Sequence, residues 1–221
     1  SSSSYSLVTD YNTIFEDEEE NGVESVFEVQ YTDKEGAGFG CLQCSEGNVA
    51  VGFNGIRNYN GPFFDGGYSF NVPTQEAYNA FEVGDNRKNV AILDIEAWAA
   101  ANNATFGTGY KHTGFYNRKY LARKGDTNIG DQNLTNPNNY RSIRYADVLL
   151  MAAEAEIEAG SLAKALEYVN LVRARAANKA GFVMKGGVAE ANYDIALYTS
   201  FADKTAATKA VRMERLLELA T

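Results

Sequence analysis

The sequence is poor in the residues that most often carry catalysis or bind metals. Its 221 residues include one histidine, one tryptophan, two cysteines and three prolines. No run of eighteen apolar residues occurs, so no stretch is long enough to span a membrane as a helix. The phosphate-binding pattern G-x-x-x-x-G-K-[ST], a G-x-G-x-x-G after a strand and the G-x-S-x-G nucleophile elbow are also missing. These absences disfavour a nucleotide-dependent enzyme and a serine hydrolase.

The first residues lack the features of a leader peptide. The chain begins SSSSYSL, with no methionine, no basic n-region and no apolar h-region, and it ends at MERLLELAT inside a predicted helix. We therefore expect a fragment of a longer protein, in which case the missing signal peptide says nothing about secretion.

Positive charge is scarce, whereas aromatic rings and glycines are abundant. Twenty Lys and Arg stand against twenty-nine Asp and Glu, for a net charge of −9 at pH 7. Nucleic acids and anionic lipids both need a basic surface, so this balance argues against either partner. Fourteen tyrosines, twelve phenylalanines and twenty glycines suit a sugar-stacking surface, although most aromatic side chains in proteins lie in cores.

Cys41 and Cys44 form a C-L-Q-C pair whose state the sequence leaves open. A closed zinc site would need two more nitrogen or sulfur ligands, and His112 is the only candidate. A redox pair would need a βαβ context and a helix N-terminus, which the flanking glycines do not supply. A local disulfide and two free thiols remain the main alternatives. We expect His112 to lie exposed in a loop without a catalytic role.

Carboxylates are plentiful, but their positions favour structure over catalysis. A glycosidase needs two acids in different environments across a cleft. The clearest acids lie instead on predicted helices beside arginines, which predicts a structural ion-pair network. Its expected members are Glu154, Glu156, Glu214, Glu218, Arg173, Arg175, Arg212 and Arg215. We expect a solvated loop at 16–22 and a plain turn at 125–133, with calcium binding as the alternative in both.

The most regular stretch, residues 139–176, predicts two antiparallel helices. Apolar residues recur three and four positions apart in each half, so they share one face of each helix. The two faces are Ile143, Ala146, Leu150, Ala153 and Ile157, then Leu162, Leu166, Val169 and Val172. We expect Gly160 to end the first helix in a left-handed conformation and Ser161 to cap the second.

Shorter elements are expected on both sides of this hairpin. Helices are predicted at 5–15, 73–82 and 203–220, and strands at 24–31, at 115–125 and, after a turn, within 84–98. The expected face of the first strand is Phe27, Val29 and Tyr31. The expected face of the last helix is Ala206, Ala210, Met213, Leu217 and Ala220, with Asp203 or Thr205 as its cap. Two stretches without periodicity, 36–68 and about 99–114, are long enough to be functional loops.

These two loops carry the side chains from which we predict a ligand site. Sugar rings stack their C–H faces on aromatic rings, while their hydroxyls need amide or charged partners. The rings are Phe39, Phe53, Tyr59, Phe63, Phe64, Tyr68, Trp98, Phe106, Tyr110 and Phe115. Each ring alone is more often a core residue, so the combination with amides carries the prediction. The predicted ligand-binding residues, with their rings open to water, are Phe53, Asn54, Arg57, Tyr59, Asn60, Phe64, Trp98 and Tyr110.

Five stretches resemble the SusD/RagB family, in the family's order. They are ESVFEVQY (24–31), GGYSFNVPTQEAYNAFEVGDNRKNVAIL (66–93), TGFYNRKYLARKG (113–125), NYRSIRYADVLLMAAEAE (139–156) and KAVRMERLLELA (209–220). The resemblance implies a mainly α fold, an α-α superhelix of tetratricopeptide-related hairpins with long loops and a few short strands. It also implies one domain fragment without its N-terminal repeats. In it, residues 1–140 are loop-rich and face the ligand, and 141–221 form a helical hairpin and terminal helix packed on the scaffold.

For function, the resemblance implies non-catalytic binding of an oligo- or polysaccharide on the extracellular face of the outer membrane. The glycan would pass to a SusC-like TonB-dependent transporter, and the membrane would be reached through a lipid anchor absent from this sequence. No obligatory cofactor is implied, although structural calcium occurs in some members. No motif transfers the family's binding residues onto positions here. The alternatives are a helical protein-interaction scaffold, whose loop rings would be buried, and a carboxylate-pair glycoside hydrolase.

Overall fold

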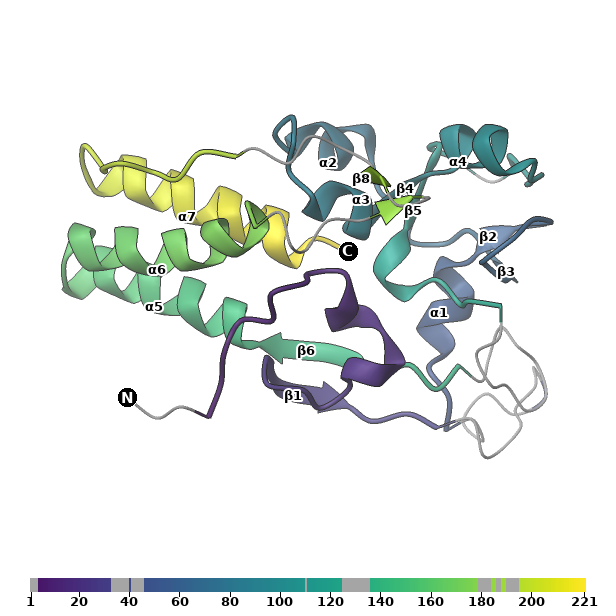
Figure 1. Ribbon diagram of the computed structural model, residues 1–221, viewed down its shortest axis with the longest axis horizontal. Coiled ribbons are helices and arrows are strands. Elements are labelled where there is room, and N and C mark those ends of the chain that lie inside the picture. The colour runs from purple at the N-terminus through teal and green to yellow at the C-terminus, as the bar shows by residue number, and fades with distance from the viewer. Residues whose placement is uncertain are drawn as a thin grey trace.

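The computed structural model of the chain describes residues 4–32, 40, 46–109, 111–124, 136–178, 184–185, 188–189 and 195–221. Three long helices lie side by side at one end, and short helices and two-stranded pairs gather toward the other (Figure 1). The mainly α fold with a few short strands is therefore confirmed. The predictions for Phe39, Cys41, Cys44, Tyr110 and the 125–133 turn fall outside the described residues.

The predicted helical hairpin is confirmed, with two corrections. It consists of α5 (Tyr145–Ala159) and α6 (Leu162–Ala176), and Ser161 caps α6 by accepting a hydrogen bond from the Ala163 amide. Ile143 belongs to strand β6 (Tyr140–Arg144) and not to the helix. Gly160 has φ −126° and ψ −118°, so the chain leaves α5 without the expected left-handed residue.

The C-terminal helix, α7 (Lys204–Leu219), packs against both helices of the hairpin. Asp203 caps it by accepting from the Ala206 amide, as expected. Its predicted face is confirmed only at Leu217, because Met213 is exposed while two glutamates are buried. The buried positions are Ala207, Val211, Glu214, Leu217 and Glu218. Arginines on neighbouring elements pair with the glutamates and so select this face.

The N-terminal segment runs across the middle of the molecule, beside β6 (Figure 1). The helix predicted at 5–15 is wrong, because only a 3-10 turn at Thr13–Phe15 forms. Strand β1 (Ser25–Val29) is confirmed and pairs antiparallel with β6. The face predicted to pack inward is not the buried one. Phe27 is 55% exposed, whereas the side chains of Glu24 and Glu28 are buried. The burial of these acids is explained by Arg144, Arg175 and Arg141 beneath them.

The 16–22 run is only partly a solvated loop. It contains a 3-10 turn at Asp17–Glu19 whose side chains include no buried residue. However, the carboxylate of Glu16 pairs with Arg123, and that of Glu20 accepts a hydrogen bond of 2.7 Å from the Asn139 amide. Two of the acids therefore tie the run to the rest of the fold.

The middle of the chain holds more helix than the sequence predicted. Helix α2 (Gln75–Ala80), capped by Thr74, confirms the helix expected at 73–82. Several other elements lie inside the two expected loops or inside the strands expected within 84–98 and 115–125. The other elements are α1 (Val49–Asn54), β2 (Ile56–Arg57), β3 (Gly66–Gly67), α3 (Arg87–Ala91), β4 (Ile92–Asp94), α4 (Ile95–Asn102) and β5 (Phe115–Asn117). Strands β2 and β3 pair in parallel, and β4 pairs antiparallel with β5. A further antiparallel pair joins β7 (Met184–Lys185) and β8 (Val188–Ala189).

The apolar interior is divided into several small clusters. One lies among α5, α6 and α7, with Leu150, Val169 and Val211 at its centre. The remaining clusters lie under the N-terminal segment, around β4 and β5, and at the end of α7. None of the described helices is both long and apolar enough to cross a membrane.

Candidate ligand-binding site

The segment from Gly52 to Asn71 folds back on itself at the end of the molecule away from α5–α7 (Figure 1). The parallel β2–β3 pair closes the fold, and the Tyr68 and Phe70 amides donate to the carbonyl oxygens of Gly52 and Phe53 at the end of α1. The last carbonyls of a helix lack partners in a following turn, and the returning chain supplies donors here, although Gly52 also accepts from the Gly55 amide at 3.2 Å. Aromatic residues far apart in this segment are thereby brought together.

Two glycines make this return possible. A Cβ built on Gly55 would lie 2.7 Å from the Gly67 Cα, and one on Gly67 would collide with the backbone of Gly52 and Gly55. Backbones can approach so closely only where neither carries a side chain. Gly66, the neighbour of Gly67, has no atom closer than 3.5 Å to its built Cβ. In β3, therefore, the need for glycine falls on Gly67 and not on Gly66.

A cluster of four rings, Tyr59, Phe63, Phe64 and Trp98, forms between this segment and α4. Trp98 donates its indole N–H to the Tyr59 hydroxyl at 3.1 Å, and that hydroxyl donates to the Pro62 carbonyl oxygen at 2.5 Å. The ring of Phe64 lies 5.1 Å from that of Trp98, and Phe63 meets Trp98 edge-on at 5.6 Å. Such tilted and edge-to-face pairs fix ring orientation.

Phe63 is the ring that faces solvent. Its side chain is 62% exposed, whereas that of Phe64 is 4% exposed and Tyr59 and Trp98 are half-buried against the core. Phe63 also has φ +70°, a left-handed conformation that is an outlier for a bulky residue. Backbone of this kind persists only where the surroundings impose it, and it occurs often at ligand-binding sites. The fold therefore holds a large apolar ring outward at a conformational cost.

Polar groups hold the cluster in place and border it. The Phe63 carbonyl accepts from the Lys124 amide, and the Lys124 ammonium donates to the Gly61 carbonyl at 2.6 Å. Asn60 exchanges backbone hydrogen bonds with Thr105, which leaves its exposed side chain at the surface. The centre of the Arg118 guanidinium lies 5.8 Å from the Trp98 ring centroid. These amide and cationic groups are the type that sugar hydroxyls bind.

The residues predicted from sequence divide into three groups. Tyr59, Asn60 and Trp98 come together in the cluster. The expectation that the Phe64 ring lies open to solvent is wrong, because Phe64 is 4% exposed, and the predicted ligand-binding residue Asn54 is buried as well, at 6%. Phe64 fills the core beneath Trp98, and Asn54 accepts from Asn71 at the end of α1.

Phe53 and Arg57 form the third group, beside a separate set of rings. Arg57 donates to the Tyr68 carbonyl oxygen at 2.6 Å, and Phe53 is half-buried with its ring 5.9 Å from that of Tyr68. His112 is half-buried beside Phe106 and not exposed as expected. The predicted ligand-binding residues did not include Phe63 or Phe70, because no local signal in the sequence shows which aromatic ring will point outward.

The carboxylates show the structural arrangement that was predicted. Glu218 is fully buried and pairs with Arg144 at 2.8 Å and with Arg175 at 2.5 Å. Glu214 pairs with Arg87 at 2.7 Å and Arg173 at 3.0 Å. Arg173 and Arg175 confirm the prediction, whereas Arg87 and Arg144 were missed because they lie far away in sequence.

The other two expected arginines do not join the buried carboxylates. Arg215 pairs with Asp147 and Glu154 near the surface, and Arg212 is exposed. Burial would raise the pKa of Glu218, but the charges of Arg175, Arg144 and Arg87 lower it to about 2. An acid held ionised in this way does not serve as a proton donor near neutral pH. Among the described residues, no three His, Cys, Asp or Glu side chains gather to form a metal site.

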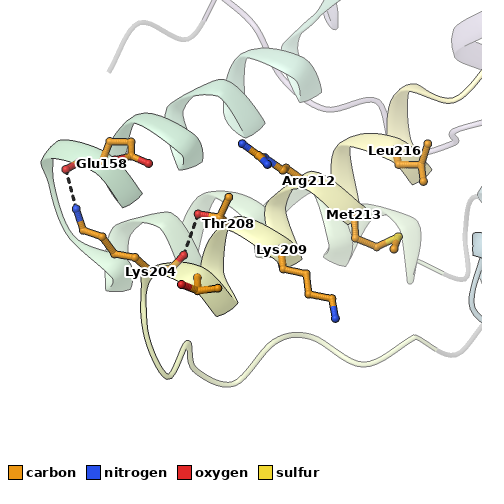
Figure 2. A pocket seen from close by; sticks show the side chains of 8 residues that line it. Glu158, Lys204, Thr208, Lys209, Arg212, Met213 and Leu216 are labelled. Atoms are coloured by element: carbon orange, nitrogen blue, oxygen red, sulfur yellow. Dashed lines mark hydrogen bonds between the residues drawn. The ribbon is translucent and has the colours of Figure 1, made fainter.

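A shallow hollow lies elsewhere, on the outer side of α7. Figure 2 shows Lys209, Arg212 and Met213 extending from the helix into it, and Lys204 donating to the Glu158 carbonyl at the end of α5. Its lining residues are Glu158, Lys204, Thr205, Thr208, Lys209, Arg212, Met213 and Leu216. No ring is among them, so this hollow offers no stacking surface for a sugar, and the aromatic cluster remains the candidate site.

Comparison with known proteins finds similarity to SusD-like proteins in both sequence and fold. The sequence profile of the SusD family matches residues 94–221. A SusD-like protein, P2, from Formosa agariphila is 30% identical over 183 residues, which cover 77% of this chain and 34% of the relative.

Solved structures agree over nearly the whole chain. A laminarin-binding SusD-like protein has a TM-score of 0.75 at 30% identity, covering 98% of this chain and 43% of its own. Surface glycan-binding protein A from Bacteroides thetaiotaomicron, solved in complex with laminarihexaose, has a TM-score of 0.73 at 27% identity, covering 99% and 45%. The chain thus spans about a third of the length of the curated relative and under half of these structures.

Proposed function

The chain belongs to the SusD family, and from this premise we propose that the protein binds an oligo- or polysaccharide at the cell surface without cleaving it. The binding surface is the cluster of Tyr59, Phe63 and Trp98, with Asn60 at its edge. The observation that carries the proposal is the outward-facing, left-handed Phe63, supported from behind by Trp98. The ligands named for two structural relatives, laminarin and laminarihexaose, support a glycan as the ligand class.

The physical argument rests on the cost of exposing this ring. An exposed phenylalanine forgoes about 1.5–3 kcal/mol of burial, and its left-handed backbone costs about 1–3 kcal/mol more. A pyranose that lies against the ring covers its apolar face, while its hydroxyls stay at the rim, where Asn60 and the backbone can bind them. Glycan binding therefore regains part of the burial free energy that the free protein forgoes by exposing the Phe63 ring.

The central test is glycan binding by the Phe63→Ala variant. We expect the purified 221-residue chain to bind laminarihexaose in isothermal titration calorimetry, and Phe63→Ala to bind about tenfold more weakly, because one stacking face is removed. Phe27→Ala is the matched control, because Phe27 is equally exposed but lies on β1. Unchanged affinity in Phe63→Ala would contradict the proposed site.

The wider ligand class is tested with a panel. Affinity gels cast with neutral, uronic-acid and sulfated polysaccharides show which glycan slows the migration of the chain. A chain that binds none of these glycans, nor any peptide offered beside them, would contradict the function as a whole.

Absence of catalysis is part of the proposal. The deeply buried acids Glu24, Glu214 and Glu218 are held in ion pairs with arginines, and none of them lines the aromatic cluster. A carboxylate-pair hydrolase would need one acid kept protonated by its surroundings. We expect no release of reducing ends when the chain is incubated with a polysaccharide that it binds. Release that disappears after replacement of a single acid would favour the hydrolase instead.

We propose further that the protein acts on the extracellular face of the outer membrane and hands its glycan to a SusC-like TonB-dependent transporter. Family membership supports this assignment. Co-purification from detergent-solubilised outer membranes tests it: a tagged protein should retain such a transporter. Recovery of the protein alone, in the same detergent, would contradict the delivery step.

We also propose that 1–140 provide the ligand-facing part and 141–221 pack on further helices of a longer protein. Met151 on α5 and Met213 and Leu216 on α7 are large apolar side chains left exposed in this chain. Its relatives are more than twice as long, which supports the proposal that further helices cover this surface. The alternative of a protein-interaction scaffold without a small ligand is favoured only by these helical faces, and the exposure of Phe63 counts against it.

A further inference from the structure

A second group of rings, Phe53, Tyr68 and Phe70, lies together at the end of α1. Their centroids are 5.9 to 6.4 Å apart, and the angles between their planes are 25 to 47°. Phe70 is 40% exposed, and Phe53 and Tyr68 are half-buried. Among the described residues, none of the three belongs to a buried apolar cluster or to the side chains packed against one. Three rings of similar tilt thus form a surface outside the core.

The backbone around these rings adopts conformations that side-chain-bearing residues seldom take. Phe70 stands between Ser69, with φ +59°, and Asn71, with φ +52°, so two left-handed residues flank it. The surroundings impose this shape. The buried Ser69 hydroxyl lies 2.7 Å from the Tyr116 hydroxyl and accepts from the Arg57 amide at 3.0 Å. Residues in such sparsely populated conformations cluster at active sites, ligand clamps and switch regions.

Polar groups lie beside the rings, as a sugar requires. The Asn71 amide group donates to the Asn54 side-chain oxygen at 3.2 Å, which orients the exposed Asn71 carboxamide and turns its own oxygen away from that bond. Arg57 fixes the Tyr68 carbonyl. An apolar plate with an oriented amide at its edge matches the two faces of a pyranose, its C–H surface and its ring of hydroxyls.

We infer that Phe53, Tyr68 and Phe70 form a second sugar-binding platform, which engages a pyranose of the same glycan that binds at Phe63. This inference rests on the proposed function and adds a second point of contact to it. Two contacts on one chain raise the affinity for a long glycan far more than for a short one, because the second binding event becomes intramolecular. The protein would therefore select polysaccharides and long oligosaccharides over disaccharides.

The test separates the two platforms by variant and by ligand length. Phe70→Leu keeps an apolar side chain but removes the stacking face, so it is expected to fold as wild type by circular dichroism. We expect it to bind laminarihexaose and laminarin about tenfold more weakly in calorimetry. In the Phe63→Ala variant, the ring signals of Phe70 in aromatic ¹³C–¹H NMR spectra should still shift when laminaribiose is added. Phe27→Leu serves as the control for an exposed ring elsewhere.

The outcomes distinguish this inference from the function on which it rests. If Phe63→Ala weakens binding, Phe70→Leu binds as wild type, and the Phe70 ring signals in Phe63→Ala do not shift with ligand, the second platform is refuted and the proposed function stands. If the wild-type chain binds no glycan, both fall. Loss of affinity in Phe70→Leu, together with ligand-dependent shifts of Phe70 in Phe63→Ala, supports two platforms.

Discussion

At the scale of the residue, this protein places charges inside and rings outside. Glu218 is fully buried and is shared by Arg144, Arg175 and Arg87, while its backbone carbonyl accepts from the Tyr11 hydroxyl at 2.7 Å. Lys119 also reaches that carbonyl, and burial and the neighbouring Arg144 charge lower the pKa of its ammonium. Phe63 and Phe70, by contrast, are held in the solvent by strained backbone. Buried ion pairs therefore hold these charged side chains inside the fold, and strained backbone holds the two aromatic rings at its surface.

The depressed pKa of Glu218 predicts acid sensitivity. Its folded-state value of about 2 lies below the unfolded value, so the unfolded state binds the extra proton. The stabilisation is complete above about pH 4.5 and is lost as pH falls toward about 2, with a total of about 3 kcal/mol. Urea unfolding between pH 2 and 6 measures this slope.

Glu218→Gln provides the comparison. It should be destabilised at pH 6 by about 3–5 kcal/mol, because arginines remain buried without their carboxylate. Its stability should also fall less steeply with acid than that of wild type. Glu154→Gln is the control, because its pair with Arg215 lies near the surface and contributes about 0–1 kcal/mol. Equal slopes for wild type and Glu218→Gln would show that Glu218 does not titrate in this range.

At the scale of the element, the smallest pairings position the candidate site. The β2–β3 pair has two residues on each side, yet it sets where the chain leaves toward Tyr59 and where it returns toward Tyr68 and Phe70. Beside it, the backbones of Gly55 and Gly67 approach so closely that neither position has room for a Cβ. α4 contributes the other half of the first ring cluster, because its cap, Asp94, accepts from the Ala97 amide and fixes the turn that carries Trp98.

A pair of neighbouring glycines tests this arrangement. Gly67→Ala should destabilise the chain by about 1–3 kcal/mol and weaken glycan binding, because its Cβ would push β3 away from Gly55. Gly66→Ala should change both by much less, since its Cβ meets no atom within 3.4 Å. Chemical denaturation and calorimetry with laminarihexaose measure the two effects. Similar losses in both variants would mean that close packing at Gly67 is not the cause.

At the scale of the whole molecule, the buried ion pairs join parts that are distant in sequence. Glu24, just before β1, meets Arg175 of α6, and Arg87 of α3 meets Glu214 of α7. Leu217 of α7 also packs with Phe81, Ile92 and Phe115. The helices and the loop-rich part therefore share a charged core and an apolar one, and neither part is complete without the other.

This sharing predicts one cooperative unfolding transition. Trp98, the only tryptophan, reports on the ring cluster through its fluorescence, and far-ultraviolet circular dichroism reports mainly on α5–α7. We expect both signals to change at the same urea concentration, as for a two-state domain. Loss of the Trp98 signal at a lower concentration would show instead that the site unfolds independently of the helices.

The sequence by itself determined the long helices, their caps and the family resemblance. Periodicity over fifteen residues and a capping serine or aspartate are local signals, so α5, α6, Ser161 and Asp203 were predicted correctly. Tertiary structure decided which residues face inward. Met213 and Phe27 are exposed and Glu24, Glu214 and Glu218 are buried, because arginines from distant segments neutralise those acids.

The candidate site shows the same division. The sequence indicated that loops rich in rings and amides would carry it. Whether Phe63 or Phe64 faces solvent depended on a left-handed backbone held by Lys124. The position of Phe70 depended on the Ser69 hydroxyl, which accepts from the Arg57 amide and shares a hydrogen bond with the Tyr116 hydroxyl. Such contacts join residues that are distant in the chain. Sequence patterns over a few turns therefore identify the helices. Ion pairs and strained backbone that depend on distant residues decide which side chains face a ligand.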